Sequence, residues 1–211
     1  MTRFYSVFVN GTLDYLLRML PGIVLAAVLF FALRPWRRRQ LAKQGLESRR
    51  FREVVLLLFW LFCGGMAMLT LTPYWFDWLP LLLGRRPIHP PFFTLGSWEL
   101  APTLGLVGLP GSYLWTWTLY ILLGNIIMFL PFGFFAALLW RGFTWRLALA
   151  TGFSITLFIE CWQLLVGRAF DVNDLLLNTL GVLLGALLAR LLLRLIPDLG
   201  RLLQVRDTAL S

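Results

Sequence analysis

A series of long apolar runs is the feature that most constrains how this chain can fold. Five of these runs approach the length of a membrane span: Leu13–Leu33, Val54–Leu71, Trp115–Leu139, Trp145–Val166 and Leu175–Ile196. A helix needs about 20 apolar residues to cross the hydrocarbon core of a bilayer. The sequence therefore predicts an all-α, polytopic membrane helix bundle with about five transmembrane helices, in a single membrane domain over residues 1–211.

The composition also favours a membrane protein over a soluble one. Hydrophobic residues make up 59% of the chain and charged residues only 14%, and the mean hydropathy is +0.78. Soluble domains carry about 25% charged residues, so a soluble core of this size could not bury so much apolar surface. Both cysteines, Cys63 and Cys161, lie inside apolar runs, which predicts small packed residues rather than a disulfide framework or a metal site.

Basic residues gather beside the apolar runs, a distribution that favours a membrane protein over a nucleic-acid-binding one. The formal net charge is +9. The connection over residues 34–53 is the most basic, with Arg34, Arg37, Arg38, Arg39, Lys43, Arg49, Arg50 and Arg52. The positive-inside rule places this loop in the cytoplasm. Alternation then predicts an N-out, C-in topology in a bacterial inner membrane, with a proline-rich outer loop over residues 72–114 and residues 167–174 outside.

Two neighbouring predicted helices each carry a stripe that is polar near its outer end. In the first helix the stripe consists of Gly152, Thr156, Glu160, Gln163 and Gly167. In the second it consists of Asp174, Asn178, Gly181, Gly185 and Ala189. Steps of three and four residues place each set on one helix face. Small residues let helix backbones approach closely in lipid, so we expect these faces to meet and to bury their polar groups.

Glu160 and Arg168 are the strongest functional candidates at this outer corner. An acidic side chain at the centre of a span costs about 2.5–3.5 kcal/mol, so a buried carboxyl is expected to have a partner or a function. We predict an outward-opening polar pocket that binds a ligand through Asn125, Glu160, Gln163, Arg168, Asp171, Asp174 and Asn178. Structural roles are predicted for Pro131, as a helix kink, and for three glycines that allow close packing, Gly133, Gly181 and Gly185.

Simpler roles for several of these residues remain open. Asp171 or Asn173 suits the N-cap of the last span, since both residue types favour that position. The amides of Asn125, Gln163 and Asn178 could form interhelical hydrogen bonds, worth about 0.6 kcal/mol each. Glu160 and Arg168 could form a purely structural ion pair.

Other functional patterns are weak, and we expect no metal and no cofactor. The stretch "DVND" begins like a calcium loop, but Leu175 and Leu176 occupy the positions where a ligand and a glycine belong. His89 is the only histidine, which makes a poor case for a metal site or a Ser-His triad. It is expected to be a solvated loop residue.

The stretches "NIIMFLPFGFF" and "SITLFIECWQLLVGRAFDVNDLLLNTLGVLLG" resemble the VanZ-like membrane protein family, named for a teicoplanin-resistance protein. The matching residues are Asn125, Phe129, Pro131, Gly133, Ser154, Glu160, Gln163, Arg168, Asp171, Asp174, Asn178, Gly181 and Gly185. They make a motif region over about residues 120–190, and "TLTP" at residues 70–73 resembles the family's end to an early span. The loop "HPPFFTLGSWEL" departs from the Asn-x-x-Pro-Phe stretch of many members. The resemblance implies lower sensitivity to lipid-bearing glycopeptide antibiotics in some members, without an established reaction.

Three functions fit these observations. The first is a non-enzymatic membrane protein of the cell envelope whose partners are membrane lipids, a lipid-linked cell-wall precursor or a lipoglycopeptide such as teicoplanin. The second is an enzyme that modifies an envelope lipid, with Glu160 or Asp174 as the general acid or base. The third is a proton-coupled transporter or flippase with Glu160 as its proton site, although five spans without an internal repeat fit poorly with common transporters.

Overall fold

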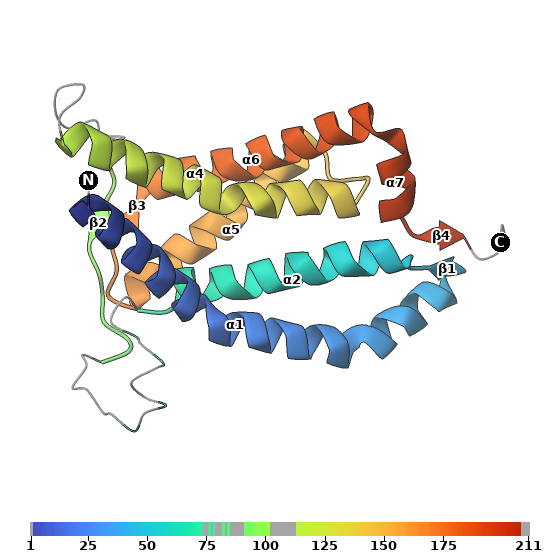
Figure 1. Ribbon diagram of the computed structural model, residues 1–211, viewed down its shortest axis with the longest axis horizontal. Coiled ribbons are helices and arrows are strands. Elements are labelled where there is room, and N and C mark those ends of the chain that lie inside the picture. Colours follow the sequence, from blue (N-terminus) through green and yellow to red (C-terminus); the bar gives the residue numbers. More distant parts are fainter. Residues whose placement is uncertain are drawn as a thin grey trace.

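The computed structural model is a bundle of long helices with two-stranded pairings at both ends (Figure 1). It describes residues 2–73, 76, 78, 82, 84, 91–101 and 113–207. The long helices are α1 (Thr2–Lys43), α2 (Arg50–Leu71), α4 (Tyr113–Leu139), α5 (Trp145–Leu165) and α6 (Val172–Leu195). A shorter helix, α7 (Pro197–Leu203), follows them, and the strands are β1 (Leu46–Glu47), β2 (Trp98–Glu99), β3 (Phe170–Asp171) and β4 (Arg206–Asp207).

Within the described part of the chain, five helices are long and apolar enough to cross a membrane. Their apolar segments are Tyr15–Lys43, Arg50–Leu71, Leu122–Leu139, Trp145–Leu165 and Val172–Leu195. These segments overlap the five runs found in the sequence. The prediction of an all-α membrane helix bundle is therefore confirmed, while the N-out, C-in orientation stays a prediction.

The two ends of the bundle carry different elements (Figure 1). Strands β2 and β3 pair in parallel at the end where α1 begins, and β1 and β4 pair antiparallel at the opposite end, near the C-terminus. Following the predicted topology, we call the end with β2 and β3 the outer end and the end with β1 and β4 the inner end.

Helix α1 extends far beyond the predicted first span. It has 42 residues, and at about 1.5 Å per residue it is roughly twice as long as the hydrocarbon core is thick. Residues 34–43, expected to belong to a loop, are helical instead, and residues 50–53 already belong to α2. The extension is held to α2 by Arg37, whose Nη2 lies 3.3 Å from Oε2 of Glu53. Only residues 44–49 connect the two helices.

Helices α4 and α6 pack closely through glycines on both helices, Gly133 on α4 and Gly181 and Gly185 on α6. A Cβ atom added at Gly181 or Gly185 would collide with backbone carbonyl oxygens of α4, and one added at Gly133 would collide with the carbonyl oxygen of Val182. This geometry explains why these three positions hold glycine. The sequence pattern had suggested that the small face of α6 meets α5, whereas its glycines meet α4. Helix α5 packs elsewhere on α6, with Gly152 against Val182 and Thr179.

Candidate functional site

The corner between α5 and α6 is shaped by a glycine turn that positions Arg168. Gly167 adopts a φ of +79°, a left-handed conformation that glycine tolerates. The backbone N–H of Arg168 donates to the carbonyl of Gln163 at 2.9 Å, the pairing that commonly ends a helix at such a glycine. The turn therefore fixes the backbone of Arg168 against the end of α5.

The Arg168 side chain reaches across the bundle to the outer end of α2. The carbonyl of Leu69 would normally accept a hydrogen bond from the residue four positions later, but that residue is Pro73, which has no N–H. Arg168 supplies the missing donor, with Nη1 lying 3.1 Å from the Leu69 oxygen. A cation at a helix C-terminus also interacts favourably with the helix dipole. This contact gives Arg168 a structural role as a cap of α2.

Two further side chains of α5 bind the next two carbonyls of α2. Nε2 of Gln163 donates to the carbonyl of Thr70 at 3.1 Å, and Nε1 of Trp162 donates to that of Leu71 at 2.6 Å. The carbonyl groups in the last turn of a helix have no partners within the helix. Together with Arg168, these residues tie the end of α2 to the α5–α6 corner.

Glu160 lies at the centre of the polar cluster and is only 1% exposed. Its Oε2 accepts a hydrogen bond from the backbone N–H of Asp171 at 2.9 Å. Asp171 in turn caps α6, because its Oδ1 accepts from the backbone N–H of Asn173 at 2.7 Å and from the Asn173 side chain at 2.8 Å. The capping role that the sequence left open for Asp171 is therefore present, and Glu160 supports the backbone of that cap.

Asn125 connects α4 to the start of α6. Its Nδ2 donates a hydrogen bond to Oδ1 of Asp174. This contact brings a residue of the third span, 49 positions earlier in the chain, to the same corner as the acidic residues.

Arg168 lies within electrostatic range of two carboxyl groups without forming a direct ion pair to a described carboxylate. Burial lowers the pKa of the Arg168 guanidinium, and the nearby Glu160 and Asp174 oppose that shift. Either of two arrangements would have excluded a polar cluster that contains both Glu160 and Arg168: a Glu160 side chain that faces lipid, or an Arg168 side chain far from every carboxylate. Neither is observed.

Three buried oxygen atoms at this corner have no hydrogen-bond partner among the described residues. They are Oγ1 of Thr156, Oε1 of Glu160 and Oδ1 of Asn178, in residues that are 0%, 1% and 3% exposed. Thr156 and Glu160 are four positions apart, so they lie on one face of α5. Buried polar groups are rarely left unpaired, because each costs about 1–3 kcal/mol. Thr156 belonged to the predicted stripe but not to the predicted site, and its unpaired hydroxyl adds it as a candidate.

A segment of the predicted outer loop covers the corner. The N–H groups of Thr94 and Gly96 donate to the carbonyls of Leu165 and Leu164 at 3.0 and 2.8 Å, and β2 pairs with β3 so that Glu99 lies opposite Asp171. A Cβ atom at Gly96 would collide with the Arg168 backbone, so the loop approaches as closely as glycine allows. His89 lies outside the described residues.

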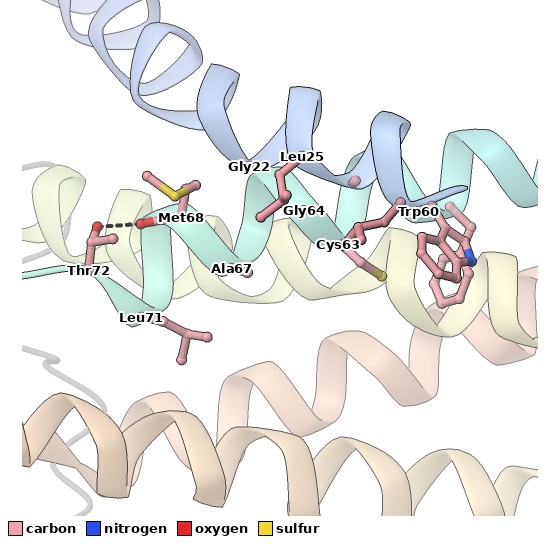
Figure 2. Close-up of a pocket in the computed structure, with 12 residues that line it drawn as sticks. Gly22, Leu25, Trp60, Cys63, Gly64, Ala67, Met68, Leu71 and Thr72 are labelled. Carbon is pink, nitrogen blue, oxygen red and sulfur yellow. Dashed lines mark hydrogen bonds between the residues drawn. The ribbon is translucent and has the colours of Figure 1, made fainter. Parts of the chain in front are cut away.

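The pocket in Figure 2 is apolar and separate from this cluster. It occupies about 510 Å³ between α1 and α2, where Gly22 and Gly64 bring the two backbones together. The hydroxyl of Thr72 is turned toward the carbonyl of Met68 (Figure 2), so it is already hydrogen-bonded. The side chains that line this pocket are mostly apolar, so the pocket is suited to apolar packing rather than to catalysis.

A family model described as VanZ/LLP1 matches residues 19–194 of the chain. The chain belongs to the VanZ/LLP1 family. The match runs from α1 into α6 and so covers far more than the motif region over about residues 120–190 that carried the resemblance. No curated protein and no solved structure matches the chain. Membership of the VanZ/LLP1 family agrees with a multi-pass membrane protein, as do the five long apolar helices among the described residues.

Proposed function

We propose that this VanZ/LLP1-family protein binds the polar headgroup of a cell-envelope lipid or lipid-linked precursor at the α5–α6 corner. The observation that carries the proposal is a set of three buried oxygens, on Thr156, Glu160 and Asn178, that have no hydrogen-bond partner in the described part of the chain. A ligand that supplied hydrogen-bond donors to these atoms would remove the cost of leaving them unpaired.

The chemistry of these atoms favours a donor-rich headgroup, and an amine above all. A carboxylate oxygen and an amide oxygen accept hydrogen bonds, and a hydroxyl can accept as well. An ammonium group carries several N–H donors, and a charged hydrogen bond to Glu160 would be stronger than a neutral one. Phosphate oxygens are acceptors and would not satisfy the unpaired oxygens of Glu160 and Asn178. Arg168 already donates to the end of α2.

An apolar groove of about 710 Å³ beside the corner supports a lipid rather than a soluble ligand. It runs between α5 and α6 and is lined by residues that include Leu149, Phe153, Leu176, Thr179 and Leu183. The lining includes Thr179, the neighbour of Asn178 on α6, although successive side chains of a helix point about 100° apart. We propose that an acyl chain in this groove extends from a headgroup held in the polar cluster. The proposed ligand is therefore a lipid whose amine or hydroxyl groups enter the cluster while its chain follows the groove.

Lipid identification on the purified protein tests the proposal. Wild-type protein extracted in mild detergent should retain an amine-bearing envelope lipid, detected by mass spectrometry, and Thr156→Val should retain much less. Thr70→Val is a matched control, because Thr70 is also buried, does not line the groove, and its hydroxyl is already bonded to the Met66 carbonyl at 2.9 Å. Equal lipid retention by wild type and Thr156→Val would contradict the proposal. A chemically altered lipid, formed only by protein with an intact Glu160, would instead establish an enzyme.

Binding at the outer surface would also account for lower sensitivity to teicoplanin, if the bound lipid is the one that the antibiotic needs to reach. Expression in a susceptible host should then raise the inhibitory concentration of teicoplanin relative to a vancomycin control that lacks the lipid tail. The same host expressing Thr156→Val at equal protein levels should lose this protection. Protection that persists in Thr156→Val would separate resistance from the proposed site.

A further inference from the structure

Two arginines, Arg52 buried and Arg37 partly buried, lie at the inner end of the bundle beside a cavity of about 340 Å³. Arg37 comes from the extension of α1 and Arg52 from the first turn of α2, and both line the cavity. This place is at the opposite end from the polar corner of α5 and α6. It therefore calls for a separate explanation.

Arg37 uses only part of its hydrogen-bonding capacity. Its Nη2 donates to Oε2 of Glu53 at 3.3 Å, and the guanidinium carbon lies 4.0 Å from the centre of the Phe30 ring. Its Nε and Nη1 atoms are buried and have no hydrogen-bond partner among the described residues. Two donors of a charged group are thus left without an acceptor.

Arg52 shows the same deficit. It is 9% exposed, its Nη1 donates to the hydroxyl of Ser48 at 3.4 Å, and its buried Nε has no partner in the described part of the chain. Arg52 lies within electrostatic range of both Arg37 and Glu53. Two cations, Arg52 buried and Arg37 partly buried, therefore share the Glu53 carboxylate, and Arg34 also lies within electrostatic range of Arg37. The place carries an excess of positive charge. Burying an uncompensated charge is costly, so an anion at this place would stabilise the arrangement.

We propose that this cavity binds the phosphate of an anionic membrane lipid. Arginine is well suited to phosphate, because its planar array of N–H groups can donate to two phosphate oxygens at once. One phosphodiester carries a single negative charge and would balance the excess charge of the two arginines. The exposed amide side chain of Gln40 also lines the cavity and can donate to the same headgroup.

The remaining walls favour a lipid over free phosphate. Trp36, Trp60 and Trp140 all line the cavity, and Trp36 and Trp140 are exposed. Tryptophan is enriched where a membrane meets water, and apolar walls would accept the glycerol and the start of an acyl chain. Basic pockets between membrane helices on the cytoplasmic side bind anionic lipid headgroups. With the predicted topology, this lipid belongs to the inner leaflet.

Thermal unfolding of the full-length protein in detergent tests this site. Phosphatidylglycerol should raise the melting temperature of the wild type in a saturable way, whereas phosphatidylcholine should have little effect. Arg52→Gln should weaken the apparent Kd for phosphatidylglycerol by about tenfold or more, the effect of losing a hydrogen bond from a charged group. Arg39→Gln is the matched control, because it removes the same charge from an exposed position that does not line the cavity.

A second variant covers the case in which Arg52→Gln does not fold. Gln40→Glu changes an exposed residue and places a carboxylate beside the expected phosphate, so it should weaken phosphatidylglycerol binding without loss of folding. Stabilisation by phosphatidylcholine equal to that by phosphatidylglycerol, or an unchanged Kd in Gln40→Glu, would overturn the proposal. Inorganic phosphate is the third probe. Protection by inorganic phosphate alone at the same concentrations would identify a soluble anion and overturn the assignment to a lipid.

Discussion

Replacing Thr156 by valine should stabilise the ligand-free protein, although the position is fully buried. Thr156 is 0% exposed, and its hydroxyl has no hydrogen-bond partner among the described residues. Valine keeps the branched shape and removes the polar atom. On the scale of protein mutations, an unpaired buried hydroxyl costs about 1–3 kcal/mol. We expect the free energy of unfolding to rise by about 1–2 kcal/mol, toward the lower part of that range.

Thermal unfolding in lipid-free detergent measures this effect. For a chain of this length, about 1 kcal/mol corresponds to a shift of about 2–4 °C, so Thr156→Val should melt about 2–8 °C above the wild type. Thr179→Val should show no such gain, because it removes a hydroxyl that already has a partner. A melting temperature of Thr156→Val below that of the wild type would mean that the hydroxyl is satisfied in the folded protein. The reasoning from unpaired oxygens would then be wrong.

Three other outcomes follow from the fold and the corner. Arg168→Ala should lower the free energy of unfolding by about 1.5–3 kcal/mol, the worth of a hydrogen bond from a charged group, measured by thermal unfolding against wild type. Gly185→Leu should reduce accumulation in the membrane, because even a Cβ there collides with the backbone of α4. A Cβ at Gly124 meets no described residue within 4 Å, so Gly124→Ala should accumulate normally. Lys43→Cys in a cysteine-free background should be labelled only after the membrane is opened, and labelling from outside intact cells would reverse the predicted topology.

The helices and the two polar stripes could be predicted because they depend on local periodicity. Glu160 and Asn178 both fall on buried faces, as steps of three and four residues indicated. The N-cap at Asp171 could be proposed for the same reason, since capping depends on the residues next to a helix start. The helical conformation of residues 34–43 was harder to predict, because the contact that holds this part of α1 joins Arg37 to Glu53 on another helix.

The capping of α2 could not be predicted from the sequence. Gln163 and Arg168 bind carbonyl groups that lie 93 and 99 positions earlier in the chain. No local pattern indicates which distant helix end a side chain will reach. The sequence did contain one signal, the "TLTP" stretch, because Pro73 leaves the Leu69 carbonyl without its usual donor. That signal predicts that a donor is needed, although it does not identify Arg168.

These contacts assign different tasks to Glu160 and Arg168, and a pair of variants should separate the tasks. Glutamine at position 160 keeps an oxygen for the N–H of Asp171 but places an N–H₂ group where the unpaired oxygen now lies. Glu160→Gln should therefore accumulate normally. It should lose retention of a donor-rich lipid, because the glutamine N–H₂ group would face the N–H or O–H donor of the lipid headgroup. Arg168→Ala should instead lose stability through the end of α2, and lipid retention per folded molecule should change less. Comparing lipid retained per folded protein in the two variants tests this assignment. If Glu160→Gln retains lipid like the wild type while Arg168→Ala loses it, then Arg168 holds the ligand and the acceptor-based argument for Glu160 is wrong.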